Sequence, residues 1–271
     1  MSDIYSAMEE IEQLSNTLRV VKEYLSRLEL SPKELKKERQ NIGLPDDYPF
    51  HGVDIKQLRT LARELHKIYK NHDYARFFKL IEALWANDHN SLEERYLAML
   101  LLQQRRRDLN EPDVCLDTWS WMWREKTLMF IQNFSLVDMI INTVSYQIME
   151  AWFELKEADS IVWDDLKAHA SEYENKWEQC LAVMTPVKRL SKYPEWVMPT
   201  LEVVMYALRS DDEDVGRAIE LALREAAKAN SDLVFEYIKR FMNKSPVITT
   251  DSLRYVARYF SKSQNAELGL T

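Results

Sequence analysis

The sequence predicts an all-α fold, arranged as a HEAT-like helical-repeat superhelix (an α-α solenoid). Glycine is scarce: 4 of 271 residues are Gly and 8 are Pro, whereas average usage would put Gly near about 7%. Folds rich in β-strands need many more tight turns. Apolar residues also recur at helical spacing along the chain, with no strand-like alternation between the helical stretches. Since no unit is repeated literally, we expect an irregular array in which each helix pair buries its apolar stripe against its neighbours.

The individual elements follow from this spacing. Residues 2–44 predict one or two amphipathic helices, with Ser31-Pro32 at the start of the second. The segment 43–49, which holds Gly43, Pro45 and Pro49, is the clearest loop. We place residues 1–49 in the same domain as a repeat array at 50–271. The expected array has a helix from about 50 to 70, the pair 74–86 and 92–104, and further helical segments near 113–134, 135–156, 161–185, 195–208, 213–228 and 232–243.

Composition indicates a cytoplasmic protein that works without a membrane anchor. No apolar run approaches the ~18 residues of a membrane span, and the polar start of the chain does not resemble a signal peptide. The two cysteines, Cys115 and Cys180, fit a reducing compartment rather than a disulfide framework. We expect a monomer, and a protein partner is compatible with this composition.

Net charge opposes a simple nucleic-acid interpretation. Lys and Arg total 36 against 44 Asp and Glu, a net charge of −8, and phosphate neutralisation normally drives DNA affinity. A basic concave face can still coexist with an acidic exterior. The candidate clusters for such a face are Arg59, Arg63, Lys67 and Lys70; Arg105, Arg106 and Arg107; and Lys188, Arg189 and Lys192. Each cluster could equally be a solvated helix flank, and cations that end a helix complement its dipole.

Residues 215–241 contain the most specific sequence motif in the chain. Two amphipathic stretches meet at a polar break, where Asp232 is the expected N-cap of the second helix. The phrase built on Arg217-Ala218-Ile219, Leu223-Arg224-Glu225 and Lys228 resembles the DNA alkylation repair enzymes of the AlkD type, which are helical-repeat glycosylases. Three further phrases and the closing segment follow the order of that family: Phe50-His51-Gly52-Val53; Ala83-Leu84-Trp85 with Glu93-Glu94-Arg95; Glu174-Asn175-Lys176-Trp177; and residues 247–259, expected as a closing helix.

The resemblance implies a site for hydrolysis of an N-glycosidic bond. Such enzymes excise cationic alkylated purines from double-stranded DNA, with a carboxylate facing the oxocarbenium-like sugar and aromatic faces around it. The family places an Asp one turn after a Trp, with an Arg and a second Trp across the groove. Asp138 matches the Asp and Phe134 takes the place of the first Trp. Arg217 and Arg224 would contact the DNA backbone.

Two positions depart from the family pattern. Cys180 stands where the Arg belongs and Leu221 where the second Trp belongs, and the family's N-terminal Tyr has no clear counterpart. Two interpretations therefore remain open. The first is a monofunctional glycosylase for positively charged N-alkylpurines, slowed by these changes. The second is a catalytically silent helical-repeat protein that binds nucleic acid weakly or serves as a protein-interaction scaffold. Asp138 itself could be either catalytic or an ordinary helix-face carboxylate paired with an Arg.

Other chemistries find little support in the sequence. The five histidines are too scattered to converge on one metal. The sequence has neither a Gly-rich phosphate loop nor a zinc-protease or nucleophile-elbow motif. We therefore expect no metal and no cofactor. Cys180 is expected as a buried thiol rather than a nucleophile.

Overall fold

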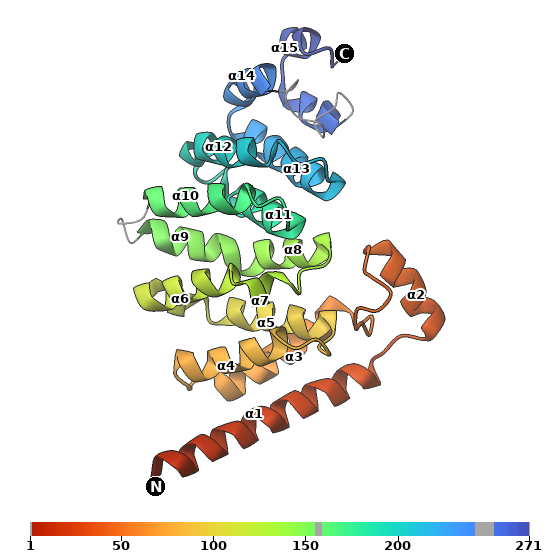
Figure 1. Cartoon of the computed structure of the whole chain (residues 1–271), viewed down its shortest axis with the longest axis vertical. Coiled ribbons are helices and arrows are strands. Elements are labelled where there is room, and N and C mark those ends of the chain that lie inside the picture. The colour runs from red at the N-terminus through yellow and green to blue at the C-terminus, as the bar shows by residue number, and fades with distance from the viewer. Residues whose placement is uncertain (1, 155–158, 242–251, 271) are drawn as a thin grey trace. The chain divides into compact units, whose positions relative to one another are not determined.

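The computed structural model describes residues 2–154, 159–241 and 252–270 (Figure 1), and within these ranges it is helical with no strand. The all-α, helical-repeat prediction is confirmed. The chain divides into two compact units, Met1–Val144 and Ser145–Thr271. Each unit is built from helices that pack against their neighbours in sequence, as a repeat architecture requires.

The first unit runs from α1 to α8. The long helix α1 packs along α4, where Arg76 donates to Gln13 at 2.8 Å, and its Thr17 hydroxyl meets the hydroxyl of Tyr69 on α3 at 3.0 Å. The helix α5 packs against α3, α4 and α8. The elements of this unit are α1 (Ser2–Arg27), α2 (Pro32–Asn41), α3 (Ile55–Tyr69), α4 (Tyr74–Trp85), α5 (Leu92–Gln104), a 3-10 turn (Arg106–Asn110), α6 (Pro112–Met122), α7 (Glu125–Leu128), α8 (Phe134–Ile140) and most of a π-helical turn (Ile141–Ser145).

The second unit is centred on α13, which packs against α11, α12 and α14. Its helix α10 in turn contacts α11 and α12, so the pairs stack in chain order. The elements are α9 (Tyr146–Glu154), α10 (Asp159–Ala170), α11 (Lys176–Met184), two 3-10 turns (Val187–Arg189 and Pro194–Trp196), α12 (Val197–Ala207), α13 (Glu213–Ala229), α14 (Ser231–Phe241), two further 3-10 turns (Ser252–Tyr255 and Ala257–Tyr259) and α15 (Lys262–Glu267).

Two local predictions differ from the structure. Helix α14 begins at Ser231, and the side chain of Asn230 caps it by accepting from the N–H of Leu233 at 3.1 Å. Asp232 was therefore the wrong N-cap; it lies inside the first turn, where its charge favours the helix N-terminus. The closing segment 247–259 lies partly outside the described residues, and its described part forms 3-10 turns rather than one α-helix.

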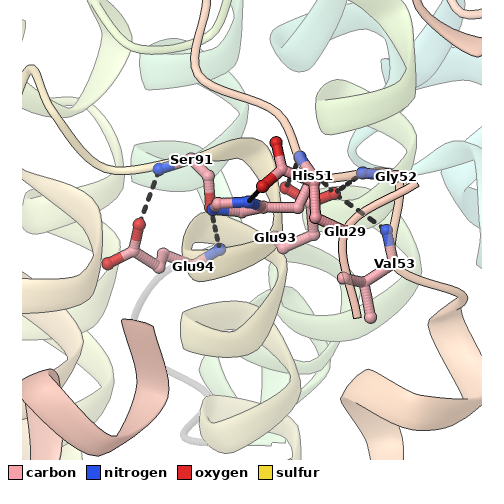
Figure 2. Close-up of polar contacts among 7 residues, drawn as sticks. All are labelled: Glu29, His51, Gly52, Val53, Ser91, Glu93 and Glu94. Atoms are coloured by element: carbon pink, nitrogen blue, oxygen red, sulfur yellow. Dashed lines mark hydrogen bonds and ion pairs between the residues drawn. The ribbon is translucent and has the colours of Figure 1, made fainter. Parts of the chain in front are cut away.

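A buried carboxylate fixes the entry to the repeats (Figure 2). Glu93 on α5 is 1% exposed and accepts backbone N–H groups from His51, Gly52 and Val53 at 2.6–3.2 Å. Gly52 has φ +76°, a region that L side chains rarely adopt. A Cβ there would also lie 2.5 Å from the Leu30 side chain. The turn therefore needs both the glycine and the carboxylate opposite it.

A buried arginine closes the neighbouring loop. Arg95 is 1% exposed and donates to the backbone carbonyls of Asn87, at 2.9 Å, and Asn90. Its guanidinium also lies over the rings of Tyr48 and Phe130, 5.0 and 4.5 Å from their centroids. These contacts replace the water that a buried cation loses. Glu93 and Arg95 thus hold the loop at residues 51–53 and the loop at residues 87–90 against α5.

Candidate functional site

Helix α8 presents the predicted catalytic carboxylate. Asn133 caps the helix by accepting from the N–H of Leu136 at 2.8 Å, so the helical register starts at Phe134. Val137 and Ile140 face the core at 0% and 1% exposure. Asp138 points away from that core and is exposed. The carboxylate is therefore accessible from solution.

An aromatic side chain accompanies this carboxylate. Phe134 precedes Asp138 by four residues, which places both on one face of α8. Phe134 is 9% exposed, so most of its side chain packs inward.

A tyrosine missing from the sequence-based site belongs to the same cluster. The hydroxyl of Tyr96 on α5 is hydrogen-bonded to the hydroxyl of Ser135, three residues before Asp138. Burial raises the pKa of Tyr96 to about 12, and the carboxylates of Glu93 and Asp138 add to the shift. Tyr96 is thus a neutral phenol near Asp138 at physiological pH. Spacing along the chain could not reveal this pair, because Ser135 lies 39 positions from Tyr96.

Helix α13 carries the predicted backbone-binding arginines. Arg217, Leu221 and Arg224 follow i, i+4, i+7 spacing and share one face. Arg217 is exposed, while Leu221 and Arg224 are half-buried. Burial raises the pKa of Glu220, whereas the nearby charges of Arg224 and Arg217 act in the opposite direction. The face therefore combines two cations and one carboxylate around an apolar side chain.

Part of the charge on Arg224 is already engaged. Its guanidinium pairs with Glu225 at 3.0 Å, and Glu225 also pairs with Lys228 at 2.5 Å. An incoming phosphate would compete with Glu225 for Arg224. Such partly solvent-exposed pairs contribute little to stability, on the order of 1 kcal/mol, so the exchange is energetically accessible.

Cys180 lies inside the second unit. It is 0% exposed on α11, the helix that packs against α13. Burial raises the pKa of its thiol, and the carboxylates of Asp214 and Asp212 add to this effect while Lys176 opposes it. Lys176 pairs with both carboxylates, at 2.7 and 3.3 Å. A protonated, enclosed thiol has neither the nucleophilicity nor the access that covalent chemistry needs.

One known protein family matches most of this chain. The family model described as "DNA alkylation repair enzyme" matches residues 25–260. The chain belongs to the DNA alkylation repair enzyme family. No curated protein and no solved structure matches the chain significantly. Membership supports a role in DNA repair with DNA as the partner.

Within this family member, the predicted site residues fall into two groups. Phe134 and Asp138 belong to the first unit, while Cys180, Leu221 and the two arginines of α13 belong to the second. The convergence of Asp138 with Cys180 and Leu221 stays a prediction, as does the placement of basic residues on a concave face. Among the described residues, no three His, Cys, Asp or Glu side chains gather as a metal site would require. Within the same ranges, every helix is too short or too polar to span a membrane.

Proposed function

We propose that this protein is a monofunctional DNA glycosylase that removes positively charged N-alkylpurines, with Asp138 as the catalytic carboxylate. The observation that carries the proposal is an exposed carboxylate that shares a helix face with Phe134 and lies near the neutral phenol of Tyr96. Family membership supports damaged DNA as the substrate. The cytoplasmic, monomeric state expected from the sequence belongs to the same proposal.

The proposed reaction breaks the bond between C1′ of the deoxyribose and the ring nitrogen of the alkylated base. The bonding electrons leave with the base, which is already cationic and needs no protonation. Positive charge then develops on the sugar, and the Asp138 carboxylate stabilises it electrostatically. Water adds to C1′ and gives up its proton, either to Asp138 or to solvent. The products are the free base and an abasic site.

The aromatic and basic groups would hold the substrate. Phe134 would line the sugar, and Arg217 and Arg224 would offer cations to phosphate oxygens. Because Leu221 has no indole face and Cys180 has no guanidinium, we expect weaker stacking on the cationic base and one phosphate clamp fewer. Excision should therefore be slow.

A silent, nucleic-acid-binding or scaffold role is the second candidate. The observations that favour it are the enclosed thiol of Cys180 and the half-buried Leu221, at positions where the family resemblance expects an Arg and a Trp. The acidic net charge of −8 points the same way. Such a protein would keep the scaffold of the family while lacking excision.

Two assays on the full chain separate the candidates. Release of alkylated bases from methylated double-stranded DNA, measured with enzyme in excess, should be slow but above background for a glycosylase. Complete absence of release alongside measurable filter binding at low salt would favour the silent role. Replacing Arg217 and Arg224 with Gln should lower the slope of log affinity against log salt by roughly 1 for each phosphate that is no longer neutralised. Arg209→Gln, a change of another exposed arginine in the same unit, is the control.

A further inference from the structure

A cationic pocket lies at the C-terminal ends of α3 and α5, within the first unit. Its volume is about 620 Å³, which falls in the range of small-molecule sites. All of its lining side chains are polar or charged, and most of the charged ones are positive. The lining residues are His66, Lys70, Gln103, Gln104, Arg105, Arg106, Arg107 and Asp108.

One arginine of the triplet has a structural role. Arg105 is 11% exposed, pairs with Asp108 and donates to the carbonyl of His72 at 2.9 Å. Its guanidinium also lies 4.9 Å from the centroid of the Phe77 ring. These contacts account for the charge of Arg105 and for that of Asp108. They also fix the turn from which the next two residues project.

The remaining cations of the pocket have no such counter-charge among the residues that the structure describes. Lys70, Arg106 and Arg107 are exposed, and none of their side chains forms a hydrogen bond or ion pair with another described residue. Complementing the helix dipole explains one cation at the end of α5, but not three around a hollow. The chain as a whole has a net charge of −8, so the charge of this cluster is opposite in sign to that of the whole protein.

His66 also lines the pocket and is affected by the same charges. Its Nδ1 atom is buried and has no hydrogen-bond partner among the described residues. Burial lowers the pKa of His66, the charges of Arg105 and Lys70 lower it further, and Asp108 opposes them. The pocket therefore combines positive potential with a buried polar atom that lacks a partner.

We propose that this pocket binds a phosphomonoester or pyrophosphate group, held by Arg106, Arg107 and Lys70. Guanidinium groups present planar pairs of N–H donors that match phosphate oxygens, while a lysine adds a mobile point charge. The group could come from a free nucleotide or from the phosphorylated end of a nucleic-acid strand. Either source presents a dianionic phosphate, which the positive field of the pocket favours over the monoanion of an internal backbone phosphate.

The pocket is separate from the proposed excision site. Tyr96 lies eight residues before Gln104 on α5, which corresponds to about 12 Å along the helix axis. Asp138 is absent from the pocket lining. Binding of a phosphate group here is therefore independent of the excision chemistry, and Asp138→Asn should leave it unchanged.

Titration calorimetry of the full chain with inorganic pyrophosphate tests the site. The unmodified protein should bind, and the double variant Arg106→Gln/Arg107→Gln should bind roughly tenfold or more weakly, because two guanidinium donors are removed. The matched control is Lys36→Gln/Lys37→Gln, which removes the same charge from exposed positions on α2. Absence of pyrophosphate binding would overturn the proposal. Equal weakening in the control would also overturn it, because the effect would then come from net charge alone.

Further titrations distinguish the two sources of phosphate. Binding of adenosine monophosphate without binding of a short single strand would identify a free nucleotide. Preference for a 5′-phosphorylated strand over the same strand with a 5′-hydroxyl would identify a strand end. Both results support the site. Equal binding of the two strands, with the Arg106→Gln/Arg107→Gln variant unaffected, would contradict it.

Discussion

Two carboxylates of the first unit, Glu93 and Asp138, carry the same charge in opposite surroundings. Glu93 is 1% exposed and accepts three backbone N–H groups in the loop that leads into α3. Asp138 projects from α8 into solvent near Phe134 and Tyr96. One carboxylate is enclosed by the fold, whereas the other stays accessible to solvent. The Glu93-Glu94-Arg95 segment, which resembles a motif of the family, thus serves the stability of the fold rather than catalysis.

The largest effect should come from the buried cation next to Glu93. Arg95→Leu would leave the carbonyls of Asn87 and Asn90 without their donor and remove the stacking on Tyr48 and Phe130. Losing one member of a buried charged network typically costs about 3–5 kcal/mol. We expect a loss of that size in the free energy of unfolding, measured by urea titration. A loss below about 1 kcal/mol would show that Arg95 does not hold the loop.

Removing the charge of Glu93 should cost somewhat less. Glu93→Gln keeps one carbonyl oxygen but turns an NH2 group toward backbone N–H donors of His51, Gly52 or Val53. Charge-assisted hydrogen bonds are worth about 1.5–3 kcal/mol, and we expect a destabilisation of about 3 kcal/mol. Urea titration checks it. An unchanged free energy of unfolding would show that the Glu93 carboxylate matters no more to folding than that of Asp138.

Gly52→Ala tests the turn that Glu93 supports. The substitution places a Cβ at φ +76° and within 2.5 Å of the Leu30 side chain. Leu30 can move in part, so we expect a cost of about 2 kcal/mol. Gly43→Ala, at φ +64° with open space around the Cβ, is the matched control and should cost less. Equal costs would indicate backbone strain alone, with no steric contribution from Leu30.

Tyr96→Phe should have a modest effect on stability and a clear effect on titration. Loss of the hydrogen bond to Ser135 should cost about 1 kcal/mol. The folded pKa of about 12 exceeds the ordinary value of 10.0, so the folded state holds the phenol proton more tightly. Stability from this group is therefore present below pH 10 and falls as the pH rises toward 12, by roughly 1.4 kcal/mol per unit. Ultraviolet titration should show one late-ionising tyrosine fewer in the variant; an unchanged count would contradict this assignment.

The smallest effect on stability should belong to the proposed catalytic residue. Asp138→Asn changes an exposed side chain, so we expect the free energy of unfolding to stay within about 0.5 kcal/mol of the parent. A loss comparable to that of Glu93→Gln would mean that Asp138 serves folding, and the distinction between the two carboxylates would disappear.

The fold was predictable from the sequence because helical periodicity is a local property. Scarce glycine and apolar spacing predicted helices such as 74–86 and 92–104 to within one residue of their observed ends. The N-cap of α14 was missed because Asn230 and Asp232 are equally good cap residues two positions apart. Tyr96 was missed for a different reason: its partner Ser135 comes from another helix, and packing between helices leaves no trace in local spacing.

The most direct test of the central claim compares single-turnover release of alkylated bases from methylated double-stranded DNA by three proteins: the parent, Asp138→Asn and Asp117→Asn. Asp117 is an exposed carboxylate on α6 of the same unit, so its variant controls for net charge. Transition-state stabilisation by one charged group is worth roughly 3 kcal/mol, or about two orders of magnitude in rate. We predict a slow parent rate, an Asp117→Asn rate equal to it, and an Asp138→Asn rate about a hundredfold lower. Excision that survives Asp138→Asn, or a parent with no excision at all, would contradict the assignment of Asp138 as the catalytic carboxylate.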